Sequence, residues 1–211
     1  MQQTAQGLAL VAVHRPDFLP FFIDWGDADH RRRIAGGKKQ LLARAVGLHK
    51  RSDLHILDAT GGLGRDAFTL AALGARVTLL EREPLLIALL EDARARALGD
   101  PALRASAGRI RVIHADALDF LQNGARWDVV HLDPMYPDHG GSALPQKQMQ
   151  VLRDLNEGDP DADALLAPAR AASFQRVVVK RPRSAPPLAQ AEPDFCLSKT
   201  QARYDIYLTP P

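Results

Sequence analysis

The stretch Leu54–Asp66 constrains the fold of this chain more than any other. A short apolar run ends on Asp58, and three glycines follow before a helical pattern of apolar residues begins. The glycines are Gly61, Gly62 and Gly64. Glycine lets a backbone come close to a ligand, because it has no Cβ and tolerates positive φ. The helix that follows presents unpaired N–H groups at its start. The stretch therefore predicts a strand, a glycine turn and a helix that together bind a ligand.

The next predicted strand, Arg76–Glu81, ends on a second acid. Glu81 lies 23 residues after Asp58, which is the expected distance for an acid that holds ribose hydroxyls. Gly62–Ala67 fits the dinucleotide fingerprint G-x-G-x-x-G/A, whereas Asp58–Gly64 resembles the S-adenosylmethionine (SAM) loop of class I methyltransferases. The glycines alone fit either cofactor, and they also fit a turn that binds nothing.

The composition is that of an ordinary soluble domain. The chain has 211 residues, of which 46% are hydrophobic and 25% charged, enough for one domain with a sizeable core. No apolar run approaches the roughly 18 residues of a membrane span, and no secretory signal pattern is visible. The single cysteine, Cys196, is interpreted as a strand residue and fits a reducing cytoplasm. Seven histidines without metal-ligand spacing predict no metal site.

Alternating strands and helices predict an α/β fold with a mostly parallel sheet and helices on both faces. A terminal antiparallel pair, Phe195–Ser198 with Tyr204–Leu208, is expected after a proline-rich stretch from Arg181 to Pro193. The other expected strands begin at Leu54 and span Arg76–Glu81, Arg109–His114, Trp127–Leu132 and Gln175–Lys180. The expected helices follow Asp66, Pro84 and Asp116, and span Gln146–Leu155 and Asp161–Ser173.

The first 50 residues are expected to form an extension to a main domain of residues 51–211. Leu8–Val13 and Pro20–Asp24 predict a two-stranded hairpin. A loop is expected from Asp24 to Asp29, and a helix over Lys38–Val46 that stops at Gly47.

Four consecutive predicted strands end on or near an acid. In an open α/β sheet, ligands bind beyond the carboxyl ends of the strands. An edge rich in hydrogen-bond acceptors suits hydroxyls, amines and a sulfonium charge, whereas it repels a pyrophosphate. This pattern favours SAM over a nicotinamide dinucleotide. The four acids are Asp58, Glu81, Asp116 and Asp133.

The run Asp133-Pro134-Met135-Tyr136 resembles the [Asp/Asn]-Pro-Pro-[Tyr/Phe] motif of SAM-dependent enzymes that methylate amino groups on bases. An exocyclic base amine is a poor nucleophile, because its lone pair is delocalised into the ring. The Asp133 carboxylate and the Pro134 carbonyl can accept its two hydrogens and stabilise the positive charge that develops on nitrogen. Tyr136 is expected to stack on the base, at about 1–3 kcal/mol per base. Taken alone, the run also fits a turn with a packed tyrosine.

Two basic clusters are candidates for binding a phosphate backbone, and each alone also fits a solvated face. A non-catalytic RNA-binding module is therefore a further hypothesis, although it leaves the acidic strand ends unexplained. The candidate RNA-binding residues are Arg31, Arg32, Arg33 and Lys38 in the first cluster and Lys180, Arg181 and Arg183 in the second.

From Phe21 to nearly its C-terminus, the chain resembles the bacterial 16S rRNA (guanine-N2)-methyltransferases of the RsmJ type. A glycine loop occurs in many protein families, whereas the runs Asp133–Pro137 and Val177–Pro182 together are specific to this one. Further matches are His30–Arg33, Gly36-Gly37, Ala43–Gly47, Asp58–Phe68, Leu80–Arg82, Asp161–Arg170, Ala185–Ala189 and Tyr204–Tyr207.

The resemblance implies a Rossmann-like class I fold, SAM as methyl donor and a guanine N2 of small-subunit rRNA as acceptor, on naked 16S rRNA or on the 30S subunit. Where the family has Ser-Ser, this chain has a carboxylate and an alanine, and the carboxylate can accept the amino hydrogens of adenine. Family members also carry a longer N-terminal segment. The implied SAM contacts are Arg65, Asp66, Glu81, Arg82, Asp116, Ala117 and Asp133, in addition to the loop residues Asp58, Gly61, Gly62 and Gly64.

Overall fold

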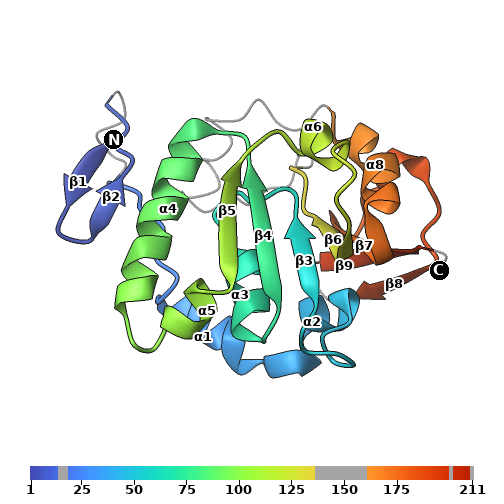
Figure 1. The fold of residues 1–211 in the computed structure, drawn as a ribbon, viewed down its shortest axis with the longest axis horizontal. Coiled ribbons are helices and arrows are strands. Elements are labelled where there is room, and N and C mark those ends of the chain that lie inside the picture. Colours follow the sequence, from blue (N-terminus) through green and yellow to red (C-terminus); the bar gives the residue numbers. More distant parts are fainter. Residues whose placement is uncertain (14–18, 136–160, 200–201, 210–211) are drawn as a thin grey trace.

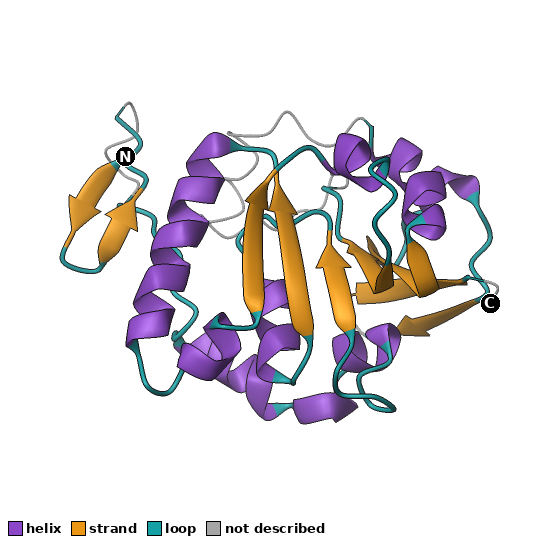
Figure 2. Cartoon of the chain, in the orientation of Figure 1, coloured by secondary structure: helices purple, strands orange, loops and turns teal. Residues whose placement is uncertain are grey.

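A seven-stranded sheet forms the centre of the computed structural model, which describes residues 1–13, 19–135, 161–199 and 202–209 (Figures 1 and 2). The strands are β3 (His55–Asp58), β4 (Arg76–Glu81), β5 (Ile110–His114), β6 (Trp127–Leu132), β7 (Ser173–Pro182), β8 (Phe195–Ser198) and β9 (Ala202–Leu208). Their order is β5-β4-β3-β6-β7-β9-β8. All pairs from β5 to β7 are parallel, and β9 and β8 are antiparallel. The predicted fold class and the terminal antiparallel pair are confirmed.

Helices cover both faces of the sheet because its strands alternate their side chains between two buried clusters. In β3, Ile56 packs into one cluster and Leu57 into the other, and β6 repeats this with Val129 and Val130. The first cluster receives side chains from α2 (Leu41–Val46), α3 (Arg65–Ala72), α4 (Pro84–Gly99) and α5 (Arg104–Ala107). The second receives them from α6 (Ala117–Leu121), the 3-10 helices η2 (Ala162–Leu165) and η3 (Leu188–Gln190), and α8 (Leu166–Ala171).

The predicted N-terminal hairpin was placed too late in the chain. The strands that pair are β1 (Gln2–Thr4) and β2 (Gly7–Ala9), because Gly7, at φ 127°, closes the turn between them. Only one bridge, between Leu10 and Phe21, remains of the expected pairing among the described residues. In Figure 1 this hairpin lies at the edge of the molecule, beside α4.

The three arginines of the first basic cluster, Arg31–Arg33, lie on a helix, α1 (Ala28–Ala35), which begins inside the predicted loop Asp24–Asp29. Asp27 caps this helix by accepting the His30 N–H at 2.7 Å. The helix predicted from Lys38 is also shorter than expected. It divides into a 3-10 turn, η1 (Gly37–Lys39), and α2, because Gln40 between them is extended at ψ 156°.

The stop at Gly47 is confirmed, with Gly47 in the left-handed region at φ 90°. The segment before residue 50 shares the core of the sheet: Ile23, Trp25 and Val46 pack in the same cluster as Ile56. A boundary at residue 50 therefore does not coincide with a division of the core, and the two-part organisation stays a prediction.

In the second half of the chain, the helix predicted over Asp161–Ser173 is two shorter elements, η2 and α8, and Ser173 already belongs to β7. β7 also runs to Pro182, further than the predicted Lys180. The helix predicted over Gln146–Leu155 lies outside the described residues. No helix in the described part of the chain is long and apolar enough to cross a membrane.

Candidate active site

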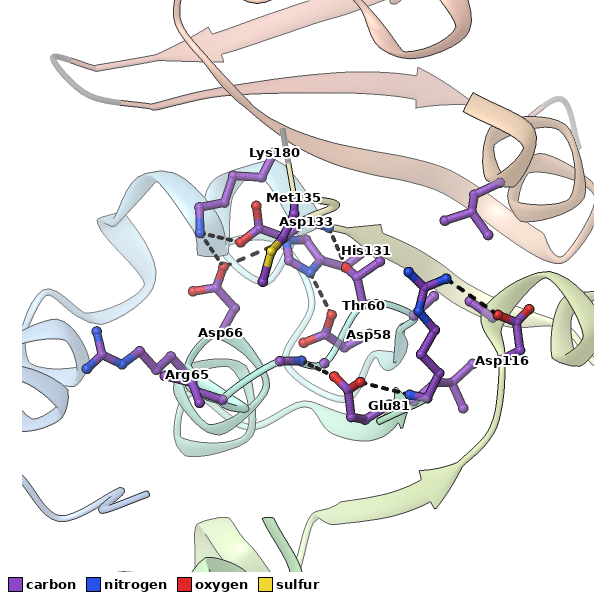
Figure 3. Close-up of a pocket in the computed structure, with 18 of the residues that line it drawn as sticks. Asp58, Thr60, Arg65, Asp66, Glu81, Asp116, His131, Asp133, Met135 and Lys180 are labelled. Carbon is purple, nitrogen blue, oxygen red and sulfur yellow. Dashed lines mark hydrogen bonds and ion pairs between the residues drawn. The ribbon is translucent and has the colours of Figure 1, made fainter. Parts of the chain in front are cut away.

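A cavity of about 260 Å³ lies at the carboxyl ends of the central strands. The strand order reverses between β3 and β6, and open α/β sheets bind ligands at such a point. Figure 3 shows acids from several elements directed toward this cavity. Its described lining holds more acids than Lys and Arg residues, which favours a cationic ligand. The acids are Asp58, Asp66, Glu81, Asp116, Asp133 and Asp161, and the basic residues are Arg33, Arg65, Arg82 and Lys180.

The three glycines of the loop between β3 and α3 serve different purposes. Gly61 packs on β4: its N–H donates to the Leu80 carbonyl at 2.8 Å, and a Cβ would lie 2.6 Å from that oxygen. Gly64 has φ 67°, and a Cβ there would lie 2.9 Å from Trp25. A Cβ at Gly62, at φ 51°, would meet no atom of the described residues within 4 Å. Of the three, only Gly62 therefore offers open backbone to a ligand.

The Glu81 carboxylate holds the glycine loop and the start of α4 together. It accepts N–H groups from Gly62 at 2.8 Å, Arg82 at 2.8 Å and Glu83 at 2.9 Å. Burial raises the pKa of Glu81, although these hydrogen bonds favour its charged form. A carboxylate offers about four lone-pair sites, so this acid retains capacity for a ligand hydroxyl.

Asp116 both caps α6 and lines the cavity. Its Oδ1 accepts the Leu118 N–H at 2.8 Å, and Ala117 begins the helix. Its Oδ2 lies 3.8 Å from the Arg82 guanidinium, which also lies 3.2 Å from Asp161. One oxygen of Asp116 is thus committed to the helix, and the other is the one that faces a charged neighbour.

A buried acid and a buried imidazole lie beneath the cavity. Asp58 Oδ1 is 3.1 Å from His131 Nδ1, and these residues are 2% and 0% exposed. Burial raises the pKa of Asp58, against the opposing effect of the imidazole. Burial disfavours the charged form of His131, but the carboxylates of Asp58, Asp66 and Asp133 outweigh it and raise the pKa of His131. His131 therefore keeps its proton to a higher pH than an exposed imidazole does.

Asp66, in the first turn of α3, receives two cations from distant parts of the chain. Arg33 of α1 and Lys180 of β7 both bind its carboxylate, the latter at 3.1 Å. Burial would raise the pKa of Asp66, but Lys180 and Arg33 outweigh burial and hold it well below its usual range. The two predicted basic clusters thus meet at an acid of the cavity.

Asp133 follows β6 and lines the cavity, as the motif predicted. Its N–H donates to the Thr60 hydroxyl at 2.6 Å, and its Oδ2 accepts from Lys180 Nζ at 2.6 Å. Pro134 follows directly, whereas Tyr136 lies outside the described residues. Lys180 thus holds one carboxylate oxygen of Asp133, and Thr60 holds the backbone N–H of the same residue.

Several predicted RNA-binding residues occupy other roles. Arg33 and Lys180 line the cavity. Arg181 is only 6% exposed and donates to the Pro186 carbonyl at 3.0 and 3.1 Å, so its assignment to a phosphate is corrected by its burial. The predicted basic residues left at the surface are the exposed Arg31, Arg32 and Arg183 and the half-buried Lys38.

Four residues that support the site were not singled out from the sequence. Thr60 and His131 hold Asp133 and Asp58, Met135 lines the cavity, and Trp25 donates its indole N–H to the Leu63 carbonyl at 3.2 Å. The histidine that follows Val129 and Val130 in β6 was a signal available in the sequence. No group of residues suited to a metal ion occurs within the described ranges.

The raised pKa of His131 predicts that the unfolding free energy falls as the pH rises above about 6.5. In that window the folded protein keeps a proton that the unfolded chain has lost, so stability decreases, by at most about 1.4 kcal/mol per pH unit. Urea unfolding between pH 6.5 and 8 measures this slope. His131→Gln should flatten it, and the exposed control His49→Gln should keep it. A flat profile in the unaltered protein would contradict the prediction.

Comparison with known proteins assigns the class. A family model described as "Putative SAM-dependent methyltransferase" matches residues 1–209. A solved SAM-dependent methyltransferase from Neisseria gonorrhoeae aligns with a TM-score of 0.74 and 32% identity, over 95% of this chain and 78% of that chain. Together with the acid-lined cavity, these matches define a SAM-dependent methyltransferase, and the nicotinamide dinucleotide alternative is set aside.

Two relatives carry the name ribosomal RNA small subunit methyltransferase J. The protein from Ectopseudomonas mendocina is 45% identical over 98% of this chain and 81% of its own length. The protein from Chromohalobacter salexigens is 46% identical over 99% of this chain and 84% of its own length. The chain belongs to the ribosomal RNA small subunit methyltransferase J family, and so to a family of enzymes rather than of non-catalytic RNA-binding modules.

Proposed function

We propose that this chain transfers the methyl group of SAM to the exocyclic N2 amine of one guanosine in 16S rRNA. The observation that carries this proposal is the Asp133 carboxylate beside the cavity, fixed at Oδ2 by Lys180 and followed by Pro134. The names of the relatives support ribosomal RNA as the substrate.

The chemistry of the cavity fits SAM. We propose that Glu81 binds the ribose hydroxyls of SAM and that Asp116, beside Ala117, binds the adenine amino group. The carboxylates near Asp66 would face the sulfonium charge. Gly62 supplies open backbone. Figure 3 shows the Arg65 side chain directed away from these acids, so Arg65 contributes backbone at the start of α3. When bound, SAM supplies an electrophilic methyl group. The remaining assigned contacts are Asp58, Gly61, Gly64, Arg82 and Asp133.

The acceptor amine would be held by two oxygens of the chain. One of its hydrogens goes to Asp133 and the other to the Pro134 carbonyl, which favours a pyramidal nitrogen with an available lone pair. The same oxygens stabilise the positive charge that develops on this nitrogen, and a fixed geometry adds the benefit of alignment. Tyr136 is assigned the stacking contact with the base. A paired guanine must first leave its helix, at a cost of a few kcal/mol.

The proposed partner is 16S rRNA or the 30S subunit in the cytoplasm, and the surface basic residues are proposed to contact its phosphates. Replacing both Arg31 and Arg183 by alanine should weaken RNA binding and reduce the slope of log affinity against log salt by about 0.7–0.9 for each phosphate that is no longer neutralised. Filter binding between low and moderate salt measures the slope. A matched control replaces two exposed arginines at the β5 edge of the sheet: Arg109, just before β5, and Arg111, on it. This double variant should leave the slope unchanged. Equal slopes in both double variants would reject the assigned surface.

The deciding experiment is radiolabelled methyl transfer onto 30S subunits and onto naked 16S rRNA from a strain that lacks this protein. Label should enter one guanosine, and mass spectrometry of the deletion strain's rRNA should show one N2-methylguanine missing. An unchanged rRNA modification profile would count against the proposal. Label that enters only another nucleic acid would support the alternative of an amino-methyltransferase with a different substrate.

A further inference from the structure

The carboxylates of Asp58, Asp66 and Asp133 line the same cavity, and the ammonium group of Lys180 contacts the last two of them. Lys180 Nζ is 2.6 Å from Asp133 Oδ2 and 3.1 Å from Asp66 Oδ2. Figure 3 shows the ammonium group reaching both acids from β7, above His131 and Asp58. This lysine therefore connects an acid at the end of β6 with an acid at the start of α3.

The position of Lys180 in the sheet suits it to fix the orientation of the Asp133 carboxylate. Its backbone belongs to β7, which is paired on both sides, in parallel with β6 and antiparallel with β9, where Lys180 faces Tyr204. Its side chain is 28% exposed. Burial disfavours the charged ammonium, but Asp133 and Asp66 outweigh burial and raise the pKa of Lys180 well above its ordinary value. The ammonium thus stays charged at neutral pH.

The contact with Lys180 distinguishes the two oxygens of Asp133. Oδ2 accepts from the ammonium, and the backbone N–H of the same residue is held by the Thr60 hydroxyl. Within the described part of the chain, these are the polar contacts of Asp133. Oδ1 is therefore the oxygen left to accept a substrate hydrogen.

We propose that Lys180 is a positioning residue for methyl transfer: it holds the Asp133 carboxylate turned so that one of its oxygens faces the acceptor amine. This inference rests on the proposed function, and it deepens that function by assigning the residue that prepares the acceptor group. The sequence had suggested a phosphate contact for this lysine, which its two carboxylate partners do not favour.

The reason such a residue is required is geometric. The acceptor amine needs one carboxylate oxygen at a fixed position, and the other oxygen of Asp133 is bound by the Lys180 ammonium. A charge-assisted hydrogen bond, roughly twice as strong as a neutral one, can fix that position. Arg33 supplies a second cation, but among the described residues its carboxylate contact is with Asp66. Of these two cations, Lys180 is the one that binds the acid after β6.

The test measures single-turnover methyl transfer onto 30S subunits by Lys180→Met, Lys180→Arg and the unaltered protein. Lys180→Met should lower the rate constant on the order of 10- to 100-fold, the value of a charge-assisted hydrogen bond, with a much smaller change in the KM for SAM. Lys180→Arg, which keeps the cation, should restore part of the rate. The exposed control Lys50→Met should match the unaltered protein.

Two comparisons separate positioning from a general effect of charge or stability. In the background of Asp133→Ala, adding Lys180→Met should cost little further rate, because its target is gone. If the cation acted only on the net charge of the acids, Arg33→Met would reduce the rate constant as much as Lys180→Met does. The inference would be overturned if the rate losses of Asp133→Ala and Lys180→Met were additive in the double variant. It would also be overturned if Arg33→Met and Lys180→Met lowered the rate constant equally.

A crystal structure of Lys180→Met bound to adenosylhomocysteine gives a readout that does not depend on the methyl acceptor. The Asp133 carboxylate should be rotated or disordered in the variant and fixed in the unaltered protein. An unmoved carboxylate would overturn the role of Lys180 even if the acceptor proved to be a different base. Absence of methyl transfer by the unaltered protein would instead count against the proposed function alone.

Discussion

Asp133→Ala is expected to reduce the rate constant of methyl transfer on the order of 10³-fold, because it removes both the electrostatic stabilisation and the alignment of the acceptor amine. The carboxylate lies beside the cavity, with Lys180 at Oδ2 and its backbone N–H on Thr60. Single-turnover transfer of labelled methyl groups onto 30S subunits measures the loss. The KM for SAM should change far less than the rate constant, since the contact matters most as charge develops on nitrogen.

Two controls separate this loss from damage to the fold. The side chain of Asp133 is 38% exposed, so its removal should leave the circular dichroism spectrum unchanged and the thermal midpoint within a few degrees. Asp119→Ala removes an acid from the solvent side of α6 and should retain full activity. Activity in Asp133→Ala close to that of the unaltered protein would reject the catalytic assignment.

The parts of the site that the sequence predicted are those set by chain-local patterns. The strand ends, the glycine turn and the acid at the end of β4 follow from periodicity and spacing, and parallel strands bring their carboxyl ends to one edge. Asp58, Glu81, Asp116 and Asp133 therefore line one cavity, as expected. This prediction needed only the order of the elements and the direction of the strands.

The parts that the sequence did not predict depend on which distant side chains meet. Lys180 and Arg33 are 147 residues apart in numbering, and both sit in runs of basic residues that resemble a phosphate-binding face. Tertiary packing instead brings both to Asp66. The role of His131 was not predicted for the same reason: a strand pattern does not show that Asp58 is the neighbour of His131 on the adjacent strand.

The N-terminal segment shows a second limit. Charged and polar residues from Asp24 to Asp29 suggested a loop, although Asp27 is a good N-cap for the helix that follows. Trp25 is almost fully buried and stacks on Phe68 of α3 at 5.0 Å between ring centroids. A short polar segment with one large aromatic residue does not reveal by its pattern that it packs beneath the glycine loop.

Gly61→Ala is expected to weaken SAM binding at least about 100-fold and to lower the unfolding free energy by about 1–3 kcal/mol, the usual cost of an overpacked core position. A Cβ there would lie 2.5 Å from the Leu79 side chain and 2.6 Å from the carbonyl oxygen of Leu80. The backbone oxygen cannot turn aside as a flexible side chain can. The loop must therefore move away from β4, which separates the Gly62 N–H from the Glu81 carboxylate. Calorimetry with SAM and urea unfolding measure the two effects.

Two further glycine variants make this prediction specific. Gly99→Ala, at the end of α4, adds a methyl group that meets no described atom within 4 Å, so it should leave both SAM affinity and stability unchanged or slightly improve stability. Gly62→Ala has open space but φ 51°, so it should cost stability through its backbone, about 1–2 kcal/mol, without the clash. If Gly61→Ala binds SAM like the unaltered protein, close packing of the loop on β4 does not control the cofactor site. If Gly99→Ala, which lies outside the loop, loses as much SAM affinity as Gly61→Ala, the loss does not come from packing of the loop on β4.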